Sequence, residues 1–105
     1  MQKYRAYVHY HFKKGMEESG IKFLETELIK HAAEMGCHNI ELWLDEKDHT
    51  RLVGTGDWNS LDEARKFQST WDKKEKELSK FLTNKPEREF YKLRNSYSEK
   101  AKKAA

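Results

Sequence analysis

Four short stretches of the chain alternate apolar and polar residues with a period of two. The first runs from Tyr4 to Phe12, and its aromatic and β-branched residues favour an extended strand. The second and third, residues 39–44 and 51–58, are separated by the charged turn DEKDH, and the fourth covers residues 87–93. Each stretch is therefore predicted to be a β-strand.

Two other stretches repeat apolar residues at spacings of three and four, which predicts amphipathic helices. The first helix is expected over about residues 17–35, with Gly36 as a left-handed cap at its end. The second begins at the S-x-x-E capping box of Ser60 and Glu63, and the poor helix formers Ser69 and Thr70 predict a kink within it. The apolar stripes comprise Ile21, Leu24, Leu28, Ala32 and Met35 in the first helix and Leu61, Ala64, Phe67 and Trp71 in the second.

The order of these elements is β-α-β-β-α-β, arranged around the central hairpin of residues 38–60. This order is typical of the ferredoxin-like α+β fold. A chain of 105 residues has room for one domain. We therefore predict a single ferredoxin-like domain over residues 1–93, followed by a basic low-complexity tail over residues 94–105.

Composition adds an expectation about assembly. Hydrophobic residues make up 36% of the chain and charged residues 37%, whereas a typical domain has about 45–50% apolar residues and about 25% charged ones. A monomer would therefore bury little apolar surface, which favours an oligomer.

The distribution of charge argues against some partners. The formal net charge is +3, and the tail alone supplies it, because residues 94–105 contain four basic residues and one glutamate. A nearly neutral body argues against a nucleic-acid partner. No run approaches the roughly 18 apolar residues of a membrane span, so no membrane partner is expected. Cys37 is the only cysteine, which fits a soluble protein in the reducing cytoplasm.

Several local motifs resemble those of a known family. They are Gly15 after the first strand, Met35-Gly36-Cys37 closing the first helix, the strand of residues 38–43, and Asp57-Trp58-Asn59-Ser60 before the capped helix. Over about residues 4–93 the chain resembles the antibiotic biosynthesis monooxygenase-like (ABM) family of the dimeric α+β barrel superfamily. The resemblance implies a homodimer whose two sheets face each other as a barrel, with a pocket between the helices and each sheet.

The same family includes cofactor-independent quinone-forming monooxygenases and haem-degrading monooxygenases. The haem-degrading branch uses an asparagine on the first strand and a tryptophan and a histidine on the second helix. The matching positions here hold Val8, Phe67, and Glu75 or Lys76. The resemblance therefore does not extend to haem ligation, and no cofactor is expected.

A planar organic ligand is the candidate occupant of the implied pocket. Aromatic side chains from three elements, Tyr10, Trp58, Phe67 and Trp71, are expected to line it, and Gly54 and Gly56 leave that part of the sheet without side chains. The alternative is that these large residues only fill a sparse core, with a helix packed on the glycines.

Catalytic candidates are few. Tyr10, His9, His11 and His31 could orient a substrate, while no metal signature, nucleophile triad or phosphate-binding glycine loop is present. The sequence thus favours a monooxygenase-like protein that binds a planar molecule between sheet and helices. A non-catalytic dimeric binding or interaction module is the alternative.

Overall fold

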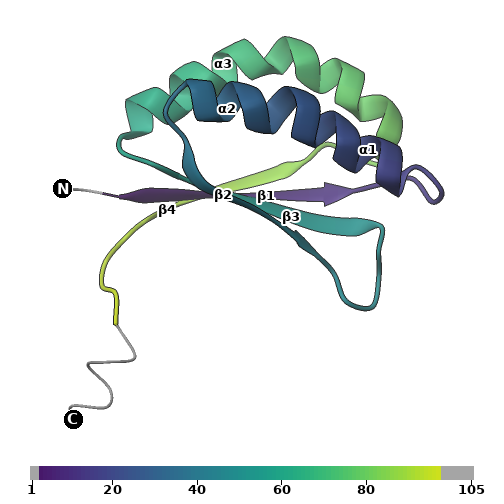
Figure 1. The fold of residues 1–105 in the computed structure, drawn as a ribbon, viewed down its shortest axis with the longest axis horizontal. Coiled ribbons are helices and arrows are strands. Elements are labelled where there is room, and N and C mark those ends of the chain that lie inside the picture. The colour runs from purple at the N-terminus through teal and green to yellow at the C-terminus, as the bar shows by residue number, and fades with distance from the viewer. Residues whose placement is uncertain (1–2, 98–105) are drawn as a thin grey trace.

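The structure, a computed structural model, describes residues 3–97. One four-stranded antiparallel sheet carries all the helices on a single face (Figure 1). The elements in chain order are β1 (Tyr4–His11), α1 (Glu17–Phe23), the π-helical segment η1 (Leu24–Ile29), α2 (Lys30–Glu34), β2 (His38–Leu44), β3 (Arg51–Trp58), α3 (Leu61–Leu78), the short 3₁₀ helix η2 (Ser79–Phe81) and β4 (Glu87–Lys92). The predicted α+β, β-α-β-β-α-β order is confirmed.

The strands lie in the order β2-β3-β1-β4, so the first strand is central and pairs with both β3 and β4. Tyr4 is opposite Trp58, and Tyr10 is opposite Leu52. Because directly opposed residues of antiparallel strands share a face, the alternation seen in the sequence sorts side chains into two sets. The apolar set, which includes Tyr10 and Val8, faces the helices.

The first helical run is continuous but changes its winding. It passes from α1 through the π-helical segment η1 to α2, and Gly36 ends it at a φ of 110°. A π turn spaces its hydrogen bonds one residue further apart than an α turn does. Near the start of the run, a Cβ at Gly20 would collide with the ring of Phe12. That glycine is therefore required by close packing of the helix on the end of β1.

The predicted kink in the second helix is wrong, because α3 runs unbroken from Leu61 to Leu78. The hydroxyl of Ser69 donates to the carbonyl of Lys66 at 2.8 Å, and that of Thr70 donates to the carbonyl of Phe67 at 2.8 Å. Both hydroxyls are thus satisfied within the helix and do not interrupt it. The Ser60 half of the predicted capping box is present, since Ser60 Oγ accepts from the backbone N–H of Glu63 at 3.2 Å.

The buried core lies between the sheet and the helices and has two parts. One part is centred on Tyr10, Leu24 and Trp71, and the other on Trp58 and Ala64. The opposite face of the sheet has no helix over it in the described chain (Figure 1). This face, which we call the open face, carries Trp43 and Tyr91 with 59% and 52% of their surface exposed.

Residues 94–97 are exposed and have no regular secondary structure, and residues 98–105 of the predicted tail lie outside the described residues. The boundary of the domain at residue 93 therefore stays a prediction. Within residues 3–97, no helix has the length and apolar character needed to cross a membrane.

Candidate functional site

A cavity of about 60 Å³ lies between the helices and the sheet. Strands β1, β2 and β3 form one wall with apolar side chains and two glycines, and the helices form the other. Arg88 and Phe90 of β4 complete the lining, and Phe90 is the exposed member of the set. The main lining residues are Ala6, Val8, Tyr10, Leu28, Ile29, Ala32, Ile40, Leu42, Gly54, Gly56, Trp58, Ala64 and Phe67.

The volume limits what this cavity can hold. An apolar cavity of about 150 Å³ is large enough to bind benzene, whereas this one has about 60 Å³. A planar ring can enter only if the cavity widens. Phe90, with 43% of its surface exposed, is the lining residue most open to solvent.

The two glycines of β3 have different roles. A Cβ at Gly56 would lie 2.5 Å from Cys37 Sγ, a distance that side-chain atoms do not tolerate. At Gly54 the nearest atoms, in Leu42 and Tyr10, would be 3.4 and 3.5 Å away, which is ordinary contact. The residue that approaches Gly56 closely is thus Cys37, just before β2. From the sequence, a helix was expected to pack on the glycines. Gly54, which has no such close neighbour, leaves part of the space of the cavity.

Three of the four aromatic candidates line this cavity. Tyr10 and Trp58 are buried on the sheet, and Phe67 reaches it from α3, with its ring centroid 5.4 Å from that of Trp58. Trp71 lies one helical turn further along, fully buried, with its ring 6.3 Å from Phe67 and nearly parallel to it. Trp71 packs in the neighbouring part of the core and does not line the cavity.

The phenol of Tyr10 and the thiol of Cys37, both in the lining, are neutral at pH 7. Burial raises the pKa of the Tyr10 phenol, with smaller and opposed effects from Arg88 and Glu75, which pair with each other at 2.9 Å. Burial, and next the negative charge of Asp57, raise the pKa of the Cys37 thiol to about 11. A thiol with such a pKa is protonated at neutral pH and is a poor nucleophile. The cavity can therefore bind and orient a molecule but offers no ionised attacking group.

The histidine candidates lie away from the cavity. His9 is on the open face, where its Nε2 is 2.8 Å from Glu89 Oε1, and His11 lines a shallow hollow of the same face with Trp43. Hydrogen bonds from His9 and next from Tyr91 lower the pKa of Glu89. In residues 3–97, no three His, Cys, Asp or Glu side chains are placed to hold a metal ion.

His31, in α2, lies at the outer surface of the helical layer, next to α3. Its Nε2 is 2.9 Å from Thr70 Oγ1, and both residues line an external groove with Trp71. Of the four catalytic candidates, the structure therefore brings only Tyr10 to the cavity.

The positions that match the asparagine, tryptophan and histidine of the haem-degrading branch do not fit that cofactor. Val8 and Phe67 line the cavity as apolar side chains, Glu75 pairs with Arg88, and Lys76 is an exposed residue of α3. None of these side chains is a usual axial ligand for haem iron.

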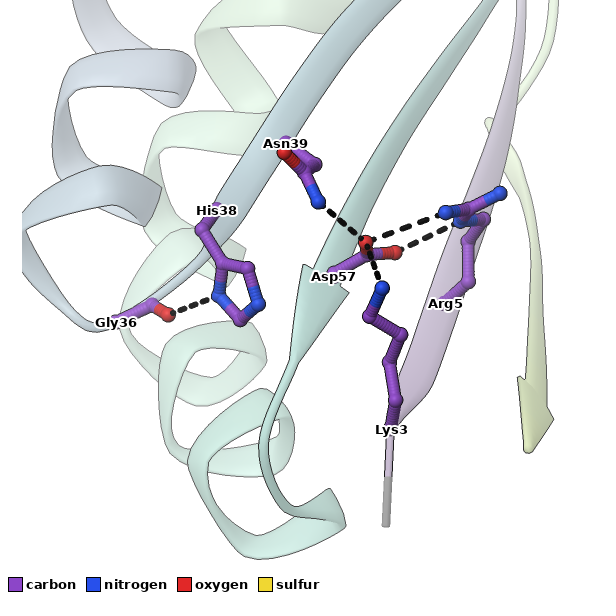
Figure 2. A network of polar contacts seen from close by, with 6 residues as sticks. All are labelled: Lys3, Arg5, Gly36, His38, Asn39 and Asp57. Atoms are coloured by element: carbon purple, nitrogen blue, oxygen red, sulfur yellow. Dashed lines mark hydrogen bonds and ion pairs between the residues drawn. The ribbon is translucent and has the colours of Figure 1, made fainter. Parts of the chain in front are cut away.

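A buried carboxylate on the open face was not expected from the sequence. The side chain of Asp57 is completely buried, although it points away from the helices (Figure 2). Arg5 Nε and Nη2 donate to its two oxygens at 2.7 and 3.2 Å, Asn39 Nδ2 donates at 3.0 Å, and Lys3 Nζ lies at 3.5 Å. These contacts tie the adjoining ends of β1, β2 and β3 together.

The local backbone is shaped to make this cluster. Asn39 has a φ of 52°, in the left-handed region that asparagine tolerates better than most residues, and the β2–β3 register shifts between His38 and Glu41. The left-handed turn and the bulge are thus accompanied by a hydrogen bond to a buried charge. Arg5 lies directly opposite Asp57 in the register of β1 and β3, and this pairing is the signal that could have revealed the cluster.

We expect Asp57→Asn to destabilise the protein in a pH-dependent way. The Arg5 hydrogen bonds hold the pKa of Asp57 at about 2, below the ordinary value of 3.8. A lowered folded-state pKa stabilises the protein above the unfolded pKa, and this contribution is lost as pH falls through the folded pKa. At pH 7 it amounts to at most about 2 kcal/mol, because Arg5 is half exposed.

Urea unfolding at pH 7 and pH 3 measures this effect. The difference in unfolding free energy between the wild type and Asp57→Asn should shrink by about half at pH 3. The exposed Asp72→Asn on α3 is the matched control and should show little difference at either pH. An equal loss at both pH values in Asp57→Asn would contradict the role given to the charge.

The comparisons with known proteins rest on structure. No protein-family model matches the sequence, and no curated protein matches it. The fold is similar to that of a conserved protein from Methanosarcina mazei Go1, with a TM-score of 0.75, 14% identity, and coverage of 87% of this chain and 92% of that one.

Two further solved structures are similar over most of the chain. One is a candidate antibiotic biosynthesis monooxygenase from Nitrosomonas europaea, with a TM-score of 0.74, 14% identity, and coverage of 85% of this chain and 88% of that one. The other is a dimeric ferredoxin-like protein from an uncultured marine organism, with a TM-score of 0.72, 14% identity, and coverage of 93% of each chain. The resemblance seen in the sequence is thus confirmed at the level of the fold, which this chain shares with ABM-like and dimeric ferredoxin-like proteins.

Proposed function

We propose that this protein is a homodimer that binds a small planar organic molecule in the cavity between its sheet and its helices. The observation that carries the proposal is the apolar cavity beside Gly54, with aromatic rings from β1, β3 and α3 around it. Apolar, partly aromatic pockets with few polar groups suit planar organic ligands. The cavity is smaller than a single ring requires, so the proposal includes widening of the cavity when the ligand enters.

The dimer is supported by the open face of the sheet. A sheet that is packed on one side needs either polar residues or a partner on the other side, and this face carries the largely exposed Trp43 and Tyr91. One of the similar structures is a dimeric ferredoxin-like protein. A second copy of this chain is therefore the occupant proposed for the open face.

Binding without catalysis is favoured over turnover by the chemistry of the lining. Tyr10 can donate a hydrogen bond to a ligand oxygen, but the Cys37 thiol is protonated and the histidines lie elsewhere. Monooxygenase-like oxidation of the bound molecule is the second candidate, because three of the similar structures are candidate antibiotic biosynthesis monooxygenases. Ligand-dependent consumption of oxygen would separate the two.

We expect a planar ligand to quench Trp58 selectively. The chain has three tryptophans, so Trp43→Phe/Trp71→Phe leaves Trp58 as the only one, at the wall of the cavity. A screen of quinones and polyphenols should find saturable quenching of this variant. Adding Gly54→Ala should weaken binding severalfold without unfolding the protein, because its Cβ would make only ordinary contacts.

The matched control is Trp58→Phe/Trp71→Phe, which leaves only Trp43 on the open face. The same ligand should cause no saturable quenching of the Trp43 emission in this control. If no compound quenches Trp58 saturably, or if Gly54→Ala has no effect on a compound that does, the cavity is not the binding site and the aromatic cluster is a packed core.

A further inference from the structure

One ion pair lies where the cavity meets a groove on the outside of the molecule. Arg88 Nη1 and Glu75 Oε1 are 2.9 Å apart, and the two side chains are only 20% and 24% exposed. Arg88 is part of the lining of the cavity. Both residues also line an open groove of about 590 Å³ between the end of α3, the loop of residues 82–86 and the start of β4. We call this second space the β4 groove.

The register of the sheet places the ion pair on the side of the helices. Arg88 is opposite Val8 in the pairing of β4 with β1, and Val8 packs against the core under the helices. Glu75 reaches Arg88 from α3. The sheet therefore separates the pair from the open face that is proposed for the second copy.

Separation of this pair enlarges the space that a ligand can use. The cavity alone has about 60 Å³, whereas an apolar cavity that binds benzene has about 150 Å³. When the Arg88 and Glu75 side chains move apart, the cavity joins the β4 groove, because Arg88 lines both. Only the ends of two partly exposed side chains have to move for this.

The charge of Arg88 then selects the ligand. Arg88 is the only charged side chain in the lining of the cavity within the part of the chain that the structure describes. A largely buried guanidinium that loses its carboxylate partner is destabilised unless another anion replaces that partner. A neutral ligand that separates the pair leaves Arg88 unpaired, whereas an anionic ligand does not.

The β4 groove favours the approach of an anion. Its lining has three basic side chains, Lys76, Lys85 and Arg88, and two acidic ones, Asp72 and Glu75. Asp72 already accepts a hydrogen bond from Gln68 at 3.0 Å. The groove therefore has one net positive charge, and a displaced Glu75 carboxylate can turn towards water in the same groove.

We propose that the ligand of the cavity is an aromatic carboxylate, whose carboxylate group replaces Glu75 on Arg88 while its ring enters the cavity. A planar guanidinium can donate two parallel hydrogen bonds to a carboxylate, which fixes the orientation of the attached ring. Tyr10 lines the same cavity, close enough to Arg88 for that charge to act on its phenol, and can donate a further hydrogen bond. This inference rests on the proposed function, because it names the class of molecule that the cavity binds.

Titration calorimetry of the full chain at pH 7 tests the proposal with 2-naphthoate and with 2-naphthamide, which has the same rings and no charge. The wild type should bind the acid at least tenfold more tightly than the amide. Glu75→Gln should bind the acid at least threefold more tightly than the wild type, because Arg88 no longer has a competing partner. Arg88→Gln should weaken binding of the acid at least tenfold.

Two further variants separate this role from a structural one. Glu75→Gln/Arg88→Gln leaves no unpaired charge and should bind the acid and the amide with affinities within threefold of each other. Glu27→Gln is the matched control, because Glu27 pairs with Lys74 at 3.0 Å outside the lining of the cavity and of the β4 groove. It should change the affinity for 2-naphthoate less than twofold.

Three outcomes overturn the proposal. Unchanged or weaker binding of 2-naphthoate by Glu75→Gln would show that the ligand does not replace Glu75. Equal affinity of the wild type for the acid and the amide would remove the carboxylate from the ligand class and leave the cavity as the binding site. If neither compound binds saturably, aromatic carboxylates are not the ligands, and the Trp58 quenching screen decides separately whether the cavity binds another planar molecule.

Discussion

Gly56→Ala should lower the free energy of unfolding by about 2 kcal/mol, because the added methyl group has no room. Its carbon would lie 2.5 Å from Cys37 Sγ, and Cys37 is held in place by the hydrogen bond from its N–H to the carbonyl of Ala32 at 2.9 Å. The thiol of Cys37 must therefore leave its buried position, or the chain at the start of β2 must move away from β3. Chemical denaturation followed by circular dichroism measures the loss.

A double-mutant cycle identifies the cause. With Cys37→Ala in place, the nearest remaining neighbour of the new methyl would be Ile40 at 3.7 Å, an ordinary contact. Gly56→Ala should then cost about 1 kcal/mol less than it does in the wild type. Gly54→Ala, two residues away in the same strand, is the matched control and should cost little. Additive effects of Cys37→Ala and Gly56→Ala would show that the clash is not what requires a glycine.

If a second copy covers the open face as proposed, the protein should elute from size exclusion with twice the mass of one chain. One chain weighs 12.6 kDa, so light scattering after size exclusion should give about 25 kDa at micromolar concentration. Trp43→Lys should shift the protein towards the monomer, because it places a charge at the most exposed tryptophan of that face.

Ala33→Lys is the matched control for this substitution. It places the same charge on an exposed position of α2, on the helical side of the molecule, and should leave the mass unchanged. A monomeric wild type would remove the dimer from the proposed function. Dissociation by both substitutions would place the interface elsewhere.

The strands and the helix boundaries follow from local patterns, which is why the sequence predicted them well. Alternation gave β3 with the bounds observed, and the Ser60–Glu63 cap gave the start of α3. Local patterns did not distinguish an α-helix from a π-helical segment, because both can carry apolar residues at the same spacing. Leu24 and Leu28 fit an α-helix in sequence, yet they lie in a π-helical segment, and serine and threonine hydroxyls proved compatible with an unbroken α3.

The candidate site depends more on distances between elements than on patterns within them. Tyr10, Trp58 and Phe67 line the cavity as the helical stripe and the strand parity indicated. Trp71 shares the stripe of Phe67, but the sequence gives no measure of how far the cavity extends along α3. Strand parity alone placed His9 and His11 on the other face, where the structure has them.

The Asp57 cluster needed information that no single strand contains. An aspartate at a polar position of a strand is normally solvated, and its sequence neighbours give no sign of burial. Only the register of β1 against β3 brings Arg5 opposite, and only the bulge in β2 brings Asn39 within reach. Register is set by turns and packing of the whole sheet.

The π turn between Leu24 and Ile29 also affects how this sequence can be aligned with others. A π turn holds one residue more than an α turn over the same hydrogen-bonded step, and it allows the consecutive residues Leu28 and Ile29 both to reach the cavity wall. An alignment with a relative whose first helix is regular must open a one-residue gap in this segment. Without that gap, every position from α2 to Gly36 is aligned one residue away from its structural equivalent. The glycine that ends the helix is then not aligned with the corresponding residue of the relative.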